Sequence, residues 1–264
     1  MSKSEDVART LLGMRASGRR IPPADWSGPP VASLADGYSA QDALTKILSA
    51  ELNQTIIGYK IGATNQTARD LLGVSEPFFG RLYAEQTHPA GSVIDAGAIY
   101  VVAEPEIAVE IGHELSPDAA PFDAAAIEAA TSALLPAIEI IASGFDPWTG
   151  AGGPTIIADN GAHGLWVPGE PMSDWSGFDV LDGEIEVNVT GHDPMTGRGG
   201  AVDGGPFAAA AWLANALAAR GEPLRAGTRI STGTVTPPIA LSPGMRIDAS
   251  YGALGTISVE IGGA

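Results

Sequence analysis

The stretch IYVVAEPEIAVEIG, residues 99–112, carries carboxylates where its pattern predicts a β-strand. Residues two apart on a strand point to the same side, so Glu104 and Glu106 share one face. A further acid, Glu139, interrupts the apolar stretch LLPAIEII at residues 134–141. Converging carboxylates repel one another and are costly to bury without a partner. A divalent cation such as Mg²⁺ or Mn²⁺ removes that cost, because it takes oxygen ligands and keeps positions open for a substrate.

A simpler interpretation of the same stretch is an amphipathic strand. In that case Glu104, Glu106 and Glu110 line a solvent-facing side, and the apolar residues between them face the core. Glu139 favours the metal interpretation, because an acid between two isoleucines has no other evident reason to be there.

Composition narrows the classes of protein. The 264 residues are 45% hydrophobic, and Lys+Arg 14 against Asp+Glu 31 gives a net charge of −17, which would repel nucleic acid. The chain has no cysteine, which excludes disulfides and thiolate chemistry and fits a reducing compartment. No apolar run approaches the roughly 20 residues that cross a bilayer, and the N-terminus lacks a signal-peptide core. We therefore expect a cytoplasmic protein without membrane or nucleic-acid partners.

The order of elements predicts an α+β fold. Residues 1–55 are expected to form an N-terminal helical region, with a capping box at Ser39 opening its second helix, and residues 56–264 a strand-rich unit. The strands do not alternate regularly with helices, which argues against a doubly wound fold and favours a mixed sheet or β-roll with flanking helices. The predicted strands are 55–63, 98–111, 136–142, 183–190, 228–232 and 255–261, and the predicted helices of this unit are 68–73, 122–134 and 206–220.

Lys60 is the first candidate outside the acids. On a strand it faces the same way as Gly58 and Gly62, which would leave an open shelf beside its ammonium group. It could neutralise an anionic substrate or donate a proton. The alternative is a solvent-facing lysine.

Other candidates lie in loops. Asp159-Asn160-Gly161 ends the apolar run 155–158, and such a sequence at a strand end is most often only a turn. The hydroxyl and backbone N–H groups of Ser231-Thr232-Gly233 could cradle a carboxylate. The histidines lack the spacing of a zinc protease. We expect them at the surface or in loops, except for His163, which follows Asn160 closely and is a candidate site residue.

Several segments, in this order and spacing, resemble the 2-keto-4-pentenoate hydratase / 4-oxalocrotonate decarboxylase family of the fumarylacetoacetate hydrolase superfamily. The resemblance runs from about residue 38 to the C-terminus. The segments are GYKIGAT (58–64), LLGVSEPFFGRL (71–82), AEPEIAVEIG (103–112), PAIEII (136–141), IADNGAHG (157–164), AAAWLANALAARGEPLRAGTRISTGT (209–234) and SYGALGTISVEI (250–261).

The resemblance implies a mixed β-sandwich or roll, usually a homo-oligomer, in which 56–264 is the catalytic domain. It implies Mg²⁺ or Mn²⁺ held by Glu104, Glu106 and Glu139, with a 2-oxo or 2-hydroxydienoate substrate chelated through its carboxylate and C2 oxygen. Lys60 would steer or polarise that substrate. The family's other matching residues, expected near the substrate, are Asp159, Asn160, Ser231, Thr232 and Gly233.

The chain also departs from the family pattern. An acid carried by many members is replaced in the segment around Phe78, and 139–144 lacks the usual aspartate and arginine. The segment 159–164 lacks two serines. The departures imply that the part of the site around the distal end of the substrate is altered. Phe78 would suit a less polar distal group. His163 is a candidate to replace the missing acid in the proton-transfer relay.

The resemblance leaves several functions open. A hydratase adding water to a 2-hydroxy-2,4-dienoate comes first. A 2-oxo acid decarboxylase, an acylpyruvate hydrolase or a tautomerase on the same metal site is the alternative. A non-catalytic partner subunit is the third, and the intact glutamates and Lys60 argue against it.

Overall fold

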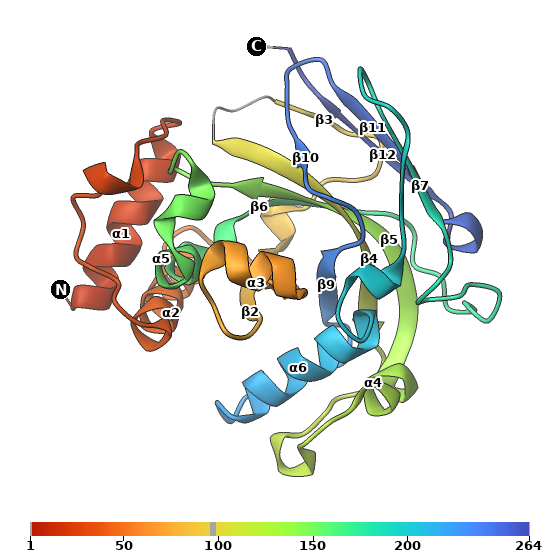
Figure 1. The fold of residues 1–264 in the computed structure, drawn as a ribbon. Coiled ribbons are helices and arrows are strands. Elements are labelled where there is room, and N and C mark those ends of the chain that lie inside the picture. Colours follow the sequence, from red (N-terminus) through yellow and green to blue (C-terminus); the bar gives the residue numbers. More distant parts are fainter. Residues whose placement is uncertain (1, 96–98, 264) are drawn as a thin grey trace.

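The computed structural model of the chain describes residues 2–95 and 99–263. Two β-sheets make up its centre, and helices lie around them (Figure 1). The first sheet has the order β2-β1-β9-β4-β5-β6, with β10 paired to β4, and the second has the order β3-β12-β11-β7-β8. The strands are β1 (Ile56–Gly62), β2 (Phe78–Tyr83), β3 (Val93–Ile94), β4 (Tyr100–Ile111), β5 (Thr131–Ala142), β6 (His163–Pro168), β7 (Ile185–Val189), β8 (Met195–Gly197), β9 (Arg229–Thr234), β10 (Ile239–Ala240), β11 (Arg246–Ser250) and β12 (Thr256–Ile261).

Five of the six helices in the described residues fall into two groups. One group lies beside the first sheet and contains α1, α2 and α5, with α1 packed on α2 and α2 on α5 (Figure 1). In the other group, α6 packs on β9, β4 and β1, and α4 packs on α6. The helices are α1 (Lys3–Ala16), α2 (Leu34–Ala50), α3 (Gln66–Leu72), α4 (Ala124–Ala130), α5 (Gly153–Ala158) and α6 (Pro206–Ala218). Among the residues described, no helix has both the length and the apolar character needed to cross a membrane.

The long antiparallel pair β4–β5 decides where the acids lie. Glu104 is directly opposite Glu139, and Glu106 is opposite Ala137. Strand alternation sends Ile107 and Val109 to the other face, into the main core. That core also contains apolar residues of α6 and of the second sheet. The acids therefore share a face of the first sheet, on the side away from α6.

Pro105 sits in the middle of β4, where a proline removes a ladder hydrogen bond. The strand tolerates it beside a β-bulge, because the β4–β9 register shifts between Glu106 and Ala108. Pro105 still accepts a hydrogen bond, from the N–H of Val235 at 2.8 Å. On the bulged strand Gly233 has φ 109°, a backbone conformation that favours glycine.

The α+β prediction is confirmed, and β1, β7, β9, β12, α3 and α6 lie within two residues of their predicted bounds. Three positions of predicted elements lie outside the described residues. They are residue 1 of the helical region, residue 98 of the strand 98–111 and residue 264 of the catalytic domain. The division of the chain at residue 55 stays a prediction.

Three predicted elements were wrong in detail. The helix predicted over 122–134 ends at Ala130, and β5 begins at the next residue. The second N-terminal helix begins at Leu34, where the Ser33 side chain accepts from the N–H of Asp36, so Ser39 is not its cap. The run before Asp159 is the short helix α5 rather than a strand, opened by a proline at its first turn. The sequence prediction also missed six strands, which are β2, β3, β6, β8, β10 and β11.

Candidate metal centre and active site

Three carboxylates converge on the shared face of β4 and β5. One ligand oxygen from each of Glu104, Glu106 and Glu139 lies within 4.8 Å of the other two. Glu106 and Glu139 are fully buried, and Glu104 is half-buried. The interpretation of these acids as a solvent-facing row is therefore wrong, although Glu110 further along β4 is partly exposed and pairs with Arg229 at 3.0 Å.

The pKa values of the acids diverge. Burial, together with neighbouring carboxylates, raises the pKa of Glu106 well above its usual range. Burial raises the pKa of Glu104 to about 7. Burial also opposes the charge of Glu139, but the Lys60 ammonium and the His163 ring outweigh it and lower the pKa of Glu139. Without a metal, the surroundings thus favour the ionised form of Glu139 and the protonated form of Glu106.

Lys60 is buried beside the acids, so the alternative of a solvent-facing lysine is wrong. Its Nζ lies 3.2 Å from Glu139 Oε2 and donates to the carbonyl of Gly161 at 3.0 Å. Burial disfavours its charge, but the glutamates, Glu139 first, raise the pKa of Lys60. It is therefore a cation inside the protein.

The expected open shelf beside Lys60 is also wrong. A Cβ on Gly58 would collide with the backbone of Arg229 on β9, and a Cβ on Gly62 would collide with the ring of Phe78. These glycines allow close packing of strands and ring rather than an opening. Phe78, predicted to contact the substrate, lies with its ring centroid 5.9 Å from Lys60 Nζ.

A chain of hydrogen bonds orients Glu106. Trp166 on β6 donates its Nε1–H to Ser231 Oγ at 3.1 Å, and Ser231 in turn donates to Glu106 Oε2. Since an indole can only donate, the serine hydroxyl must accept from it and direct its own proton to the glutamate. Glu106 Oε1 is buried without a hydrogen-bond partner among the described residues. An acceptor in that situation fits a cation.

His163 is buried and contacts Glu139. Its Nδ1 lies 2.8 Å from Glu139 Oε1, whereas its Nε2 has no hydrogen-bond partner in the described part of the chain. Burial lowers the pKa of His163, with partial compensation from Glu139. The ionised glutamate therefore assigns the proton of a neutral ring to Nδ1 and leaves Nε2 as an acceptor. In the fold, β5 supplies a carboxylate partner for this histidine, Glu139.

A second β-bulge places His163 on the face of the acids. The β5–β6 register pairs Ile140 with Leu165 and Ile141 with His163, so Gly164 is the extra residue on β6. A Cβ on Gly164 would lie 2.7 Å from both Ala142 Cβ and the Ile140 carbonyl. Bulges next to active sites commonly redirect a side chain in this way.

The turn before β6 has an unusual backbone. Asn160, Gly161 and Ala162 have φ values of 54°, 66° and 58°, so three consecutive residues are left-handed. The Asn160 amide holds the turn against β2, because its Oδ1 accepts from the Arg81 N–H at 2.7 Å and its Nδ2 donates to the Arg81 carbonyl at 2.9 Å. Asp159 is paired with Arg15 of α1 at 2.6 Å.

Three predicted site residues therefore have other contacts. Asp159 and Asn160 bind Arg15 and the backbone of β2, and Thr232 donates its hydroxyl to the Ile107 carbonyl at 2.6 Å. These bonds support the architecture of the site and do not support direct contact of the three side chains with substrate. Lys60, Phe78, His163 and Ser231 do lie at or beside the carboxylates.

The sequence prediction missed Arg15 and Trp166. Arg15 belongs to a helix that was treated as a separate region, and only the fold brings it to residues about 145 positions away. Trp166 lies in an apolar run with no motif, so nothing local indicated its hydrogen bond.

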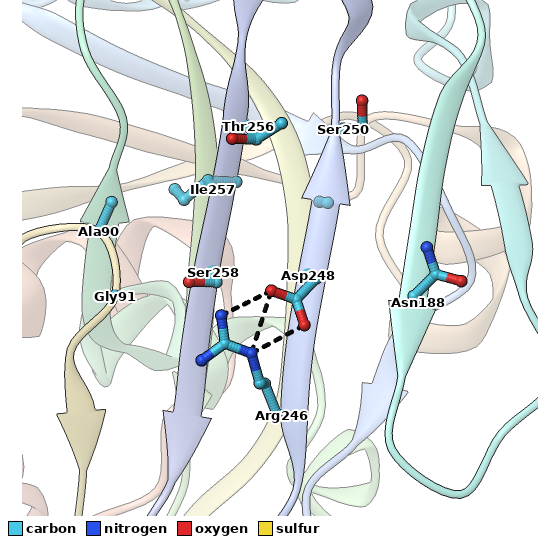
Figure 2. Close-up of a pocket in the computed structure, with 10 residues that line it drawn as sticks. Ala90, Gly91, Asn188, Arg246, Asp248, Ser250, Thr256, Ile257 and Ser258 are labelled. Atoms are coloured by element: carbon cyan, nitrogen blue, oxygen red, sulfur yellow. Dashed lines mark hydrogen bonds and ion pairs between the residues drawn. The ribbon is translucent and has the colours of Figure 1, made fainter.

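A hollow on the outer face of the second sheet, drawn in Figure 2, differs in kind from this site. It is lined by short polar side chains of β7, β11 and β12, and its charged residues, Arg246 and Asp248, pair with each other at 2.7 Å. Both are exposed, and such pairs contribute little. We therefore assign the chemistry to the buried carboxylates.

A two-sheet α+β fold with clustered carboxylates, a buried lysine and a histidine–glutamate pair defines a candidate metal-dependent enzyme. The chain is 32% identical to 2-keto-4-pentenoate hydratase 1 of Dechloromonas aromatica, covering 97% of this chain and 95% of that protein. It is 31% identical to 2-hydroxyhexa-2,4-dienoate hydratase of Comamonas testosteroni, covering 97% and 96%. No family model matches the chain.

Solved structures agree with these relatives. The 4-oxalocrotonate decarboxylase from Pseudomonas putida G7, complexed with magnesium and adipate, superposes with a TM-score of 0.85 at 27% identity, covering 98% of this chain and 97% of that one. The chain belongs to the 2-keto-4-pentenoate hydratase / 4-oxalocrotonate decarboxylase family and is an enzyme of the lyase type.

Proposed function

We propose that the protein is a divalent-metal-dependent hydratase that adds water to a 2-hydroxy-2,4-dienoate. The observation that carries the proposal is the buried group of Glu104, Glu106 and Glu139 beside Lys60. The names of the relatives, hydratases of 2-keto-4-pentenoate and 2-hydroxyhexa-2,4-dienoate, support this substrate class.

The three glutamates would hold Mg²⁺ or Mn²⁺. Hard cations take carboxylate oxygens, and the buried Glu106 Oε1 lacks any other partner among the described residues. When bound, the cation supplies Lewis-acid stabilisation of negative charge on the C2 oxygen of the substrate. The family decarboxylase structures with magnesium or calcium support a divalent ion, and the choice of Mg²⁺ or Mn²⁺ is our proposal.

Lys60 and His163 would handle charge and protons. Lys60, cationic because of the glutamates, attracts the substrate carboxylate and can donate a proton. In the reaction, the dienol loses its C2 hydroxyl proton and gains a proton at C5, which gives a 2-oxo-3-enoate. Water then adds across C3 and C4, with hydroxyl on C4 and hydrogen on C3. His163 Nε2, assigned as an acceptor, can take the proton of the attacking water.

Decarboxylation is the second candidate. It is favoured by the superposition with 4-oxalocrotonate decarboxylase. The same stabilised C2 oxygen would accept the electron pair of the breaking C–CO₂ bond in a vinylogous β-keto acid. A non-catalytic subunit is disfavoured, because such a subunit has no reason to keep clustered buried acids that are costly without a cation.

The test is the loss of ultraviolet absorbance of 2-hydroxypenta-2,4-dienoate with purified protein, with Mg²⁺ or Mn²⁺ and again with EDTA. We expect metal-dependent loss that yields 4-hydroxy-2-oxopentanoate. If metal-loaded protein does not turn over this dienoate but releases CO₂ from 4-oxalocrotonate, the protein is a decarboxylase and the hydratase proposal is wrong. No turnover of either substrate would contradict both.

We further propose a homo-oligomer located in the cytoplasm, as the family resemblance implies. Light scattering behind size-exclusion chromatography tests the first part, with a mass near that of one 26.9 kDa chain as the contradicting result.

A further inference from the structure

Arg15, near the end of α1, is partly buried and reaches across to the turn beside the carboxylates. Its Nε donates to Asp159 Oδ1 at 2.6 Å, and its Nη1 donates to the His163 carbonyl at 2.5 Å. Its Nη2 donates to the Asp159 carbonyl at 2.9 Å and to the Ala142 carbonyl at 3.1 Å. One guanidinium therefore joins both ends of the turn 159–163 to the last residue of β5.

The turn held in this way carries two contacts to the site. The carbonyl of Gly161 accepts from Lys60 Nζ, and the ring of His163 contacts Glu139. The turn also contains the left-handed non-glycine residues Asn160 and Ala162, each of which costs about 1–2 kcal/mol relative to an ordinary backbone. Such a backbone persists only where surrounding contacts enforce it.

We propose that Arg15 is a positioning residue of the active site, and that α1 is thereby part of the catalytic machinery. The inference rests on the proposed function, since it assigns Arg15 to the placement of Lys60 and His163 around Glu139. A planar guanidinium can reach acceptors on three different residues at once, whereas a lysine ammonium is a point charge with three donors.

Arg9 of the same helix provides a matched control. Its guanidinium pairs with Glu51 at 2.6 Å and with Glu5 at 3.3 Å, and these side chains are 39–50% exposed. Arg9 thus ties α1 to α2 at the surface and has no hydrogen bond to the turn 159–163. Loss of either arginine removes ion pairs of α1, but only loss of Arg15 releases the turn.

The experiment compares wild type, Arg15→Gln, Arg15→Lys and Arg9→Gln at a temperature where circular dichroism shows each to be folded. The measurements are the Kd for Mn²⁺ by calorimetry, kcat and KM for the dienoate, and the side-chain ¹⁵N shifts of His163 in the metal-free protein. We expect Arg15→Gln to weaken Mn²⁺ binding about tenfold or more, lower kcat, and shift the His163 resonances. Arg15→Lys should recover part of the loss, and Arg9→Gln should match wild type.

A folded Arg15→Gln protein with wild-type Kd, kcat and ¹⁵N shifts would overturn the proposal. If Arg15→Gln does not fold, Asp159→Asn is the deciding variant, because it weakens the contact of Arg15 Nε while keeping the backbone acceptors. An unchanged Kd for Mn²⁺ and unchanged ¹⁵N shifts in Asp159→Asn would also overturn the proposal. If wild type itself neither binds Mn²⁺ nor turns over the dienoate, the proposed function fails. The ¹⁵N shifts of the metal-free variants then still test the placement of His163 by Arg15.

Discussion

At the residue scale, Glu106 Oε1 is a buried carboxylate oxygen without a hydrogen-bond donor among the described residues. The other oxygen of the same group accepts from Ser231, whose hydroxyl is in turn bound by Trp166. The direction of these bonds is fixed by the indole donor, so the carboxylate is held in one orientation. The surrounding residues therefore leave Oε1 without a hydrogen-bond partner, as expected for an oxygen that binds a cation.

Ser231→Ala tests this orientation. The change removes the donor to Glu106 and the acceptor for Trp166, so we expect about 10–100-fold weaker Mg²⁺ binding and a stability loss of about 1–3 kcal/mol. Calorimetry and urea denaturation measure the two effects. Thr232→Val is the matched control, because its hydroxyl binds the Ile107 carbonyl and not a glutamate. It should lose stability but keep metal affinity, and equal losses of affinity in both variants would contradict the account.

Lys60→Met tests the buried cation. We expect kcat/KM to fall about 10²–10⁴-fold, because the substrate loses a proton donor and a positive charge. In the presence of Mg²⁺ the melting temperature should change little, since the ion compensates the carboxylates that Lys60 faces. Steady-state kinetics and thermal melts check both results. A large drop in melting temperature with unchanged kinetics would make Lys60 a structural residue.

At the element scale, two β-bulges shape the site. One, on β9, lies beside Glu106, and the other, at Gly164 on β6, brings His163 to Glu139. Both depend on glycines at positions where a side chain would collide with a neighbour. Register irregularities of this kind are selected by tertiary contacts, so alternation in the sequence gives no sign of them.

Gly164→Ala should therefore disturb the site through the backbone. The new Cβ would lie 2.7 Å from Ala142 Cβ, so β6 must move away from β5. We expect a loss of about 1–3 kcal/mol in unfolding free energy and reduced turnover, measured by urea denaturation and the dienoate assay. Gly177→Ala, where nothing lies within 4 Å of the added carbon, should stay within about 0.5 kcal/mol of wild type. Similar values for the two variants would show that the bulge tolerates a side chain.

Sequence patterns predicted some elements better than others, for physical reasons. The strand containing Glu104 and Glu106 has clear alternation, and α3 has a glycine in the left-handed conformation at its end, Gly73. The start of β5 was missed because Thr131 follows directly on an alanine-rich helix that ends without glycine or proline. The clustering of the acids was predicted from two segments, whereas their support by Arg15 and Trp166 depends on contacts that only the folded chain creates.

At the scale of the whole molecule, the N-terminal helices and the first sheet jointly support the site. Gln41 of α2 donates to the carbonyls of Phe79 on β2 and Ile157 on α5, and Arg15 of α1 holds the turn before β6. The resemblance to the family, which begins near residue 38, gave no role to α1. The structure indicates that α1 supports the same centre as the strands.

Metal binding should be coupled to protons. The pKa of Glu104 is raised to about 7 and that of Glu106 well above its usual range, so the metal-free protein holds protons that a cation must displace. We expect the association constant for Mg²⁺ to rise as the pH increases from about 6 to 8, with protons released on binding. Calorimetry at one pH in buffers of different ionisation enthalpy measures the release. Binding heats that do not depend on the buffer would contradict these pKa values.

The most direct test of the central claim, that these glutamates form the metal centre, is the stoichiometry of Mn²⁺ binding to wild type, Glu106→Gln and Glu110→Gln by calorimetry. Glu110 is a matched acid on the same strand that pairs with Arg229 outside the cluster. We predict one ion per chain for wild type and Glu110→Gln, and none for a folded Glu106→Gln protein, which should also lose activity. Wild-type binding by Glu106→Gln would contradict the account.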